Sequence, residues 1–281
     1  MLLTLLACHN PPAITGPTTR LVRVVDDVPL RADIYHPAEV EGAPVALLVH
    51  GGAFVEGARD DESTVGWAHR AAEAGFVAVA VDYRLLADLP DDAPGYPAPL
   101  LDVACAAGWA TEVLEDVGPG RVAVGTSAGG TLATLTALGA APEDPSCPWE
   151  TPRFDGVVAL YAVHDWAALA DTRALYASEQ ALLGSDCADE ADRVGICAEA
   201  SSARAVASGA PPFFLAASAD DGAVPASQSA LMAEALREAG VAVEHRELTE
   251  AGHGFSTRAS HPEVGPLLDE IVDWMGAAAD P

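Results

Sequence analysis

The 281-residue chain contains 42 acidic and 14 basic residues, which gives a formal net charge of −28 at pH 7. All of the basic residues are arginine, which excludes mechanisms that need a lysine, such as a Schiff base or a Walker A phosphate site. The acidic excess argues against a nucleic-acid partner, and the lack of any apolar run of about 18 residues argues against a transmembrane helix.

The first 19 residues are predicted to form a lipobox-like N-terminus and a flexible tether, followed by one domain at 20–281. Residues 5–8 read Leu-Leu-Ala-Cys, which resembles the bacterial lipobox, where the cysteine, here Cys8, is lipidated. The segment lacks a basic region and its apolar run is shorter than the usual ~7–15 residues, so a frayed cytosolic N-terminus is the alternative. We therefore expect an extracytoplasmic protein with a possible lipid anchor, and a cytoplasmic protein as the alternative.

From residue 20 onward, segments typical of strands alternate with segments typical of helices. Arg20–Val25 and Pro29–Tyr35 should pair as a hairpin through Asp26 and Asp27. Most later strands are short, continuous apolar runs, the pattern of strands buried on both faces. Further strands are predicted at 45–49, 76–81, 121–125, 157–161, 213–217 and 241–248, and helices at 63–74, 101–116, 128–138, 227–239 and 262–278. This alternation predicts an α/β fold with a mostly parallel sheet between layers of helices.

The alternation lapses between about residues 162 and 210, which we predict to be a lid inserted over one end of the sheet. Two aromatic residues in this segment, Trp166 and Tyr176, could line an acyl or aryl pocket, with core packing as the alternative. His164 is a further candidate for a substrate contact.

The five cysteines are an odd number, which usually leaves one thiol unpaired. If Cys8 carries lipid, four remain, and they can pair in three ways. Cys187 and Cys197 lie close together in a loop-like stretch and form the natural pair, which leaves Cys105 to pair with Cys147. The alternative is four free thiols. None of the spacings is that of a zinc site.

The strongest motif is the segment 125–130, Gly-Thr-Ser-Ala-Gly-Gly, which follows a predicted strand and precedes a predicted helix. It has the G-x-S-x-G pattern of a nucleophile elbow, in which a sharp turn exposes the serine, here Ser127, at a helix N-terminus. Small neighbours are needed because the backbone at the serine is strained. The alternative is a turn of small residues without chemistry.

A second motif, residues 50–54 (His-Gly-Gly-Ala-Phe), directly follows an apolar strand. Its backbone N–H groups could point at an oxyanion, and large side chains would block that approach. Together with the residue after the nucleophile, the predicted oxyanion hole has the donors Gly52, Ala53 and Ala128. His50 would then brace the loop and would not act as a base.

A serine nucleophile needs a general base that a carboxylate orients. His253 is the predicted base because it lies in a loop between the last strand and the last helix. The acid should follow the strand at 213–217, where Asp220 and Asp221 compete. We choose Asp221 because it stands in the phrase D-x-x-V-P. The resulting order of serine, acid and histidine is the one expected for a nucleophile-elbow enzyme.

Taken in this order, the motifs resemble the α/β-hydrolases of the esterase/lipase group. The chain is most similar to bacterial esterases related to hormone-sensitive lipase and to short carboxylesterases that include feruloyl and xylan esterases. The segments that carry the resemblance are 50–54, 81–84, 96–102, 125–130, 221–225 and 252–255. The resemblance implies an eight-stranded sheet, a carboxylate brace for Arg84, and the shorter esterase type, because no long cap precedes His50.

The combined interpretation is a serine carboxylesterase that hydrolyses small neutral or apolar carboxylic esters through an acyl-enzyme. The sequence implies no metal, no organic cofactor, a small-molecule ester as partner, and no particular oligomeric state. Alternatives on the same triad are an acetyl or feruloyl carbohydrate esterase and an amide hydrolase of the arylformamidase or peptidase type. A non-catalytic binding protein on the same fold is the remaining alternative.

Overall fold

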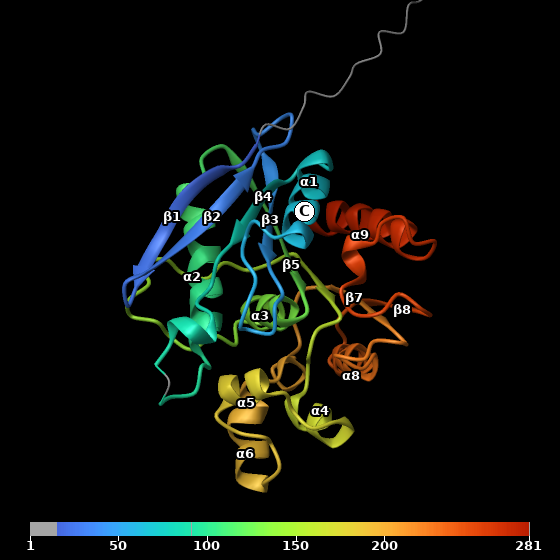
Figure 1. Ribbon diagram of the computed structural model, residues 1–281. Coiled ribbons are helices and arrows are strands. Elements are labelled where there is room, and N and C mark those ends of the chain that lie inside the picture. Colours follow the sequence, from blue (N-terminus) through green and yellow to red (C-terminus); the bar gives the residue numbers. More distant parts are fainter. Residues whose placement is uncertain (1–15, 91, 281) are drawn as a thin grey trace, which may run out of the picture.

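An eight-stranded sheet forms the centre of the computed structural model, which describes residues 16–90 and 92–280 (Figure 1). The strand order is β1-β2-β4-β3-β5-β6-β7-β8; the β1–β2 and β2–β4 pairs are antiparallel and the other pairs are parallel. The strands are β1 (Thr18–Val25), β2 (Val28–Tyr35), β3 (Ala43–Val49), β4 (Val77–Val81), β5 (Val117–Thr126), β6 (Gly156–Leu160), β7 (Phe213–Ser218) and β8 (Val243–Leu248). The predicted mostly parallel α/β sheet is confirmed.

Helices cover both faces of this sheet (Figure 1). The helices are α1 (Glu62–Glu73), η1 (Leu86–Asp88), α2 (Ala98–Val113), α3 (Ala128–Ala137), α4 (Trp166–Thr172), α5 (Ala177–Leu183), α6 (Glu190–Val194), α7 (Ile196–Glu199), η2 (Ser202–Arg204), α8 (Ser227–Glu238), η3 (Phe255–Thr257) and α9 (Val264–Ala279). α1 and α9 bury Trp67 and Ile271 on one face, and α2, α3 and α8 pack on the other. Within the described ranges, none of these helices combines the length and apolar character needed to cross a membrane.

The alternation of side chains along β3 explains why this segment forms a central strand. Val45 and Leu47 are buried under the helices of one face, whereas Ala46 and Leu48 are buried under those of the other. A strand in this position has no solvent-facing side, so its sequence is a continuous apolar run.

A few boundaries differ from the prediction. The N-cap of α1 is Asp61, so Ser63, the predicted cap, lies in the first turn. The helix α2 begins at Ala98, earlier than predicted. β1 begins at Thr18, within the predicted tether, because Thr18 pairs with Ile34 on β2 and so extends the hairpin.

The structure contains both of the cysteine pairs that the sequence favours. Cys105 on α2 is joined to Cys147 in the loop after α3, and Cys187 is joined to Cys197 on α7. The alternative of four free thiols is therefore wrong for this structure. Cys8, the candidate for lipidation, lies outside the described residues.

Arg84 has the carboxylate brace that the resemblance implies. Its Nε and Nη2 donate to the two carboxylate oxygens of Asp102 at 2.8 and 3.2 Å, and its backbone amide donates to the same group at 2.9 Å. Arg23 on β1 adds a contact of 2.6 Å. Because the Asp102 side chain is fully buried, its charge depends on these partners. The brace ties the hairpin and the end of β4 to α2.

Replacing Arg84 with methionine should lower the free energy of unfolding by about 3 kcal/mol, because it leaves a buried carboxylate with only part of its compensation. Urea unfolding monitored by circular dichroism measures this. The matched control is Arg246→Met, which removes a half-exposed arginine that pairs with Glu270 and should cost less than about 1 kcal/mol. Equal losses in the two variants would contradict the structural role of the buried brace.

Candidate active site

Ser127 lies between β5 and α3, at the sharp turn that the motif predicts. Its φ of 51° and ψ of −123° form a conformation that residues other than glycine rarely adopt. The surroundings are tightly packed: a Cβ at Gly125 would collide with the backbone oxygen of Gly129, and a Cβ at Gly129 with that of His50. Glycines at these two positions therefore allow the turn that presents the serine hydroxyl at the N-terminus of α3.

His253 connects this serine to a buried carboxylate. Its Nε2 lies 3.0 Å from Oγ of Ser127, and its Nδ1 lies 2.7 Å from Oδ2 of Asp221. The Asp221 side chain is fully buried, and its Oδ1 accepts hydrogen bonds from the amides of Ala223 and Val224. A carboxylate acceptor at Nδ1 holds the proton of the neutral imidazole on that atom, which leaves Nε2 able to accept the serine proton.

The neighbouring Asp220 has a different role. Its carboxylate accepts a hydrogen bond from the Ser218 hydroxyl at 2.5 Å and one from the Gly252 amide at 2.7 Å. These hydrogen bonds lower the pKa of Asp220, the one from Ser218 most strongly. Asp220 thus holds the beginning of the loop that carries His253, whereas Asp221 contacts the imidazole itself. The choice of Asp221 from the sequence agrees with this geometry.

The predicted oxyanion residues lie around Ser127. Gly52, Ala53 and Ala128 line the same pocket as the serine. The loop turns sharply, with φ of 113° at Gly52 and 52° at Ala53, and a Cβ at Gly52 would collide with the backbone oxygen of Glu56. In the part of the chain that the structure describes, the N–H groups of these three residues donate no hydrogen bond to another protein group. They are therefore available to an oxyanion.

His50 braces the oxyanion loop. Its ring stacks on Tyr83, with 4.1 Å between the ring centroids, and its Nδ1 lies 2.7 Å from the carbonyl oxygen of Gly51. Burial lowers the pKa of His50, so the ring is neutral and Nδ1 donates to that carbonyl. The Tyr83 hydroxyl donates to the His50 carbonyl at 3.0 Å. This is the structural role expected from the sequence.

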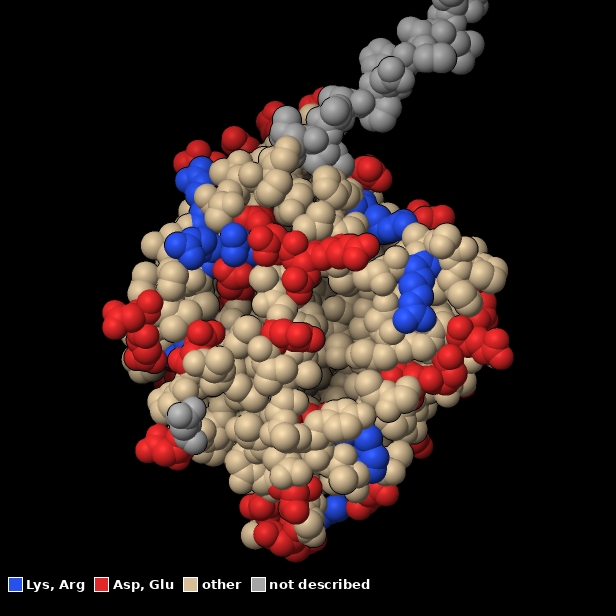
Figure 2. Space-filling view, in the orientation of Figure 1, with Lys and Arg blue, Asp and Glu red and all other residues tan. Residues whose placement is uncertain are grey.

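Ser127 and His253 open onto a pocket of about 580 Å³, a volume typical of small-molecule sites. Figure 2 shows this face of the molecule hollowed near its centre, with acidic side chains close to the hollow. The pocket walls include the apolar and aromatic residues Phe54, Tyr161, Val163, Trp166, Tyr176 and Val224, and the polar residues Glu56, Asp61, Ser63, Thr64 and Thr257. The walls thus combine an apolar lining with a few carboxylates and hydroxyls.

The three residues of the predicted lid that the sequence singles out have different positions. Trp166 and Tyr176 both line the pocket; Trp166 is only 1% exposed and also packs in the core, whereas Tyr176 is 47% exposed. The prediction that His164 contacts substrate is wrong. His164 is fully buried away from the pocket, and its Nδ1 lies 2.8 Å from the hydroxyl of Ser202. It joins the beginning of the lid (residues 162–210) to its end.

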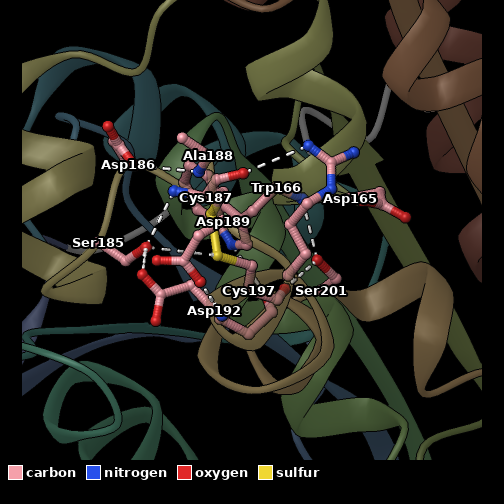
Figure 3. The surroundings of a disulfide bond; sticks show 12 residues. Asp165, Trp166, Ser185, Asp186, Cys187, Ala188, Asp189, Asp192, Cys197 and Ser201 are labelled. Atoms are coloured by element: carbon pink, nitrogen blue, oxygen red, sulfur yellow. Dashed lines mark hydrogen bonds between the residues drawn. A yellow bond between two sulfur atoms is a disulfide. The ribbon is translucent and has the colours of Figure 1, made fainter.

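The disulfide between Cys187 and Cys197 lies beside Trp166 (Figure 3). The indole Nε1 of Trp166 donates to the carbonyl of Ala200 at 3.0 Å, and its amide donates to the Ser201 hydroxyl at 2.9 Å. That hydroxyl in turn donates to the carbonyl of Cys197 at 2.5 Å. The disulfide therefore stabilises the segment that anchors a pocket residue.

Burial lowers the pKa of His164 from 6.5 to about 3, with a smaller contribution from His245. The unfolded chain consequently binds one more proton than the folded chain between these pH values, so stability falls as the pH drops below 6.5. Between pH 7 and pH 5, wild type should lose about 2 kcal/mol more unfolding free energy than His164→Gln. Urea unfolding at both pH values measures the difference. The same loss in both proteins would contradict the conclusion that burial of His164 causes this pH dependence of stability.

Tyr161, Arg173 and Glu179 are among the pocket-wall residues that sequence reasoning missed. The ring of Tyr161 meets the His253 ring edge-on at 4.9 Å, and its hydroxyl lies 2.6 Å from that of Ser256. Its position at the end of a predicted strand was the one available signal. The Arg173–Glu179 ion pair lies in the lid and belongs to no motif.

Comparison with known proteins agrees with this fold. Among curated proteins, the chain is 32% identical to Esterase LipC of Mycobacterium tuberculosis over 90% of this chain and 63% of that protein. It is 30% identical to Esterase LipQ of the same organism over 95% of this chain and 65% of that protein. The chain thus spans less than two thirds of the length of these relatives.

Two solved structures have the same fold. One is an esterase from Thermogutta terrifontis with bound propionate, with a TM-score of 0.74 and 23% identity over 95% of this chain and 96% of that one. The other is an acetyl ester-xyloside bifunctional hydrolase from Caldicellulosiruptor lactoaceticus, also with a TM-score of 0.74 and 23% identity, over 95% and 98%. A family model described as BD-FAE matches residues 32–236. The chain therefore belongs to the BD-FAE family and has the α/β-hydrolase fold.

Proposed function

We propose that the protein is a serine carboxylesterase that hydrolyses small neutral or apolar carboxylic esters. The observation that carries the proposal is the hydrogen-bonded series from Ser127 through His253 to Asp221 in a pocket that also holds three unused backbone donors. The names of the curated relatives support action on ester bonds: two are esterases and a third, LipM, is a probable carboxylic ester hydrolase.

The reaction follows from this geometry in two steps. Ser127 Oγ attacks the carbonyl carbon of the ester while Nε2 of His253 accepts its proton, and the oxyanion that forms faces the N–H groups of the oxyanion loop and of Ala128. Asp221 stabilises the imidazolium. The leaving alcohol takes the proton from His253, and the acyl group remains on the serine. Water then attacks the acyl-enzyme with the same histidine as base, which releases the acid and restores the serine.

The pocket supports the proposed class of substrate. Its apolar and aromatic walls favour an uncharged acyl or alcohol group. Glu56 and Asp61, which also line the pocket, together with the net charge of −28, disfavour anionic esters.

Hydrolysis of p-nitrophenyl acetate, butyrate and octanoate tests the proposal. We expect turnover of the short esters at low and high salt, with the decline toward octanoate reporting the size of the acyl pocket. Formanilide, a small peptide and acetylated xylan oligosaccharides, tested in parallel, represent the amide-hydrolase and carbohydrate-esterase alternatives. Folded protein that cleaves none of the p-nitrophenyl esters would overturn the proposal.

We also propose that the protein acts outside the cytoplasm, with Cys8 as the site of lipid attachment. The two disulfides support an oxidising compartment, because such bonds rarely persist in the cytosol of mesophiles. Mass spectrometry of the native N-terminus tests the anchor: a lipidated Cys8 is expected, and a chain that retains an unmodified Met1 would contradict it.

A further inference from the structure

Arg173, at the end of α4, is held against the pocket by an ion pair with Glu179. Its Nη1 and Nη2 donate to the two carboxylate oxygens at 2.8 and 2.6 Å, and both side chains are largely buried. This pairing raises the pKa of Arg173, which is therefore charged. Its guanidinium also lies over the ring of Tyr176, 3.9 Å from the centroid. The arginine head group is thus fixed in one position.

The same guanidinium reaches the loop that carries Asp221. Its Nε donates to the carbonyl of Ala223 at 3.0 Å, and the amide of Ala223 donates to Oδ1 of Asp221 at 2.8 Å. The other carboxylate oxygen contacts Nδ1 of His253 at 2.7 Å. A continuous series of contacts therefore runs from the lid to the imidazole.

The lid supplies the support on the outer side of this loop. Gly222 is exposed, and apart from its two chain neighbours no residue in the described ranges lies within 4 Å of the place where its Cβ would be. In the described part of the chain, the side chains that donate to the carbonyls of Gly222 and Ala223 are those of Tyr176, at 3.5 Å, and Arg173. Without Arg173, this loop would keep its internal hydrogen bonds but lose the shorter of its two hydrogen bonds to the lid.

We propose that Arg173 is a positioning residue for ester hydrolysis, which holds Asp221 through Ala223 in the orientation that His253 requires. The inference rests on the function proposed above. A displaced carboxylate would stabilise the imidazolium less well, which weakens His253 as a base. Attachment of the lid would thereby contribute to the rate of the chemical step as well as to the shape of the pocket.

Arg193 offers a matched control on the same lid. It pairs with both carboxylate oxygens of Asp171 at 3.0 and 2.6 Å, so its removal also breaks a bidentate lid ion pair. It does not line the pocket, and none of its hydrogen bonds reaches the loop of Asp221.

The test compares wild type, Arg173→Gln and Arg193→Gln on p-nitrophenyl acetate and butyrate, with active sites counted by an organophosphate. In Arg173→Gln we expect kcat to fall about tenfold for both esters, equivalent to about 1.4 kcal/mol, while KM changes less than twofold. Arg193→Gln should retain the wild-type kcat. If Arg173 acted only by lining the pocket, its replacement would instead change KM in a manner that depends on acyl length.

The pH profile gives a second readout. The charged residues in hydrogen-bond contact with His253 are Asp221 and Arg258, and both are retained in every variant. If Asp221 is displaced, the apparent pKa of the acidic limb of kcat/KM falls, because the imidazolium loses its partner. If the variant acted only by removing the positive charge of Arg173, this apparent pKa would rise instead.

The inference would be overturned if Arg173→Gln kept the wild-type kcat and the apparent pKa of its acidic limb did not fall. A change confined to KM would overturn it as well. Failure of wild type to hydrolyse any ester would instead refute the proposed function. If Arg173→Gln does not fold, Arg173→Lys gives the same comparison, because lysine keeps the charge but cannot hold Glu179 and Ala223 with one planar group.

Discussion

Replacing Ser127 with alanine should lower kcat for p-nitrophenyl acetate on the order of 10⁵- to 10⁶-fold and leave the fold intact. The Ser127 hydroxyl, 3.0 Å from Nε2 of His253, is the proposed nucleophile. Without it, the residual rate comes only from the oxyanion donors and from substrate binding. Alanine should tolerate the backbone of this turn, because Ala53 already has a φ of 52°, close to the 51° of Ser127.

The matched control for this variant is Ser229→Ala, which removes a buried hydroxyl on α8 outside the pocket. It should keep nearly full activity. Circular dichroism and urea unfolding establish that both variants are folded. Turnover above about one per cent of the wild-type value in folded, contaminant-free Ser127→Ala would reject Ser127 as the nucleophile. Removal of a serine nucleophile leaves far less activity than that.

Replacing Asp221 with asparagine should lower kcat about 10⁴-fold, the loss typical when an amide replaces the carboxylate of a serine–histidine–aspartate triad. The amide group can donate to Nδ1, which favours the tautomer with its proton on Nε2 and so blocks acceptance of the serine proton. The nearly isosteric change preserves the hydrogen bonds that Oδ1 accepts from Ala223 and Val224. Steady-state kinetics against the same ester measures the loss.

Asp220→Asn is the comparison that separates the two adjacent carboxylates. Asp220 contacts Ser218 and the Gly252 amide, and it has no hydrogen bond to the His253 ring. Its replacement should therefore change kcat less than about tenfold, because the amide oxygen of asparagine can still accept both hydrogen bonds. A larger loss in Asp220→Asn than in Asp221→Asn would reverse the assignment of the acid.

The strands of the sheet were predictable because burial on both faces leaves a simple pattern. β3 and β4 are short apolar runs, and β7 begins with two phenylalanines that pack on opposite faces. Helix ends were less accurate: the N-cap position of α1 is Asp61, two residues before Ser63, although its side chain makes no capping hydrogen bond, and both residue types are common at N-caps. Local sequence alone does not distinguish between two such neighbours.

The residues around Ser127 and His253 were predictable because their chemistry restricts residue type. Only small residues fit beside the elbow, where a Cβ at Gly125 would meet the backbone of Gly129. No comparable restriction on residue type applies to the lid. Its contact with the loop of Asp221 depends on Arg173 and on the carbonyl of Ala223, which lie 50 residues apart in the chain.

His164 shows that the role of a single histidine in the lid cannot be predicted from the sequence alone. Its neighbour Trp166 lines the pocket, whereas His164 is buried and contacts Ser202. The two residues are separated by only one position, so the direction of each side chain depends on how the segment packs and not on its composition. A histidine near a binding pocket is therefore weak evidence for a role in binding.

The most direct test of the central claim is to trap the acyl-enzyme. Wild-type protein mixed with p-nitrophenyl butyrate is quenched in acid within the first turnover, digested and examined by mass spectrometry. The account predicts a burst of p-nitrophenolate that matches the protein concentration and one butyryl group on the peptide that contains Ser127. Steady release of p-nitrophenolate with Ser127 unmodified at every quench time, or acylation of a different residue, would contradict the account.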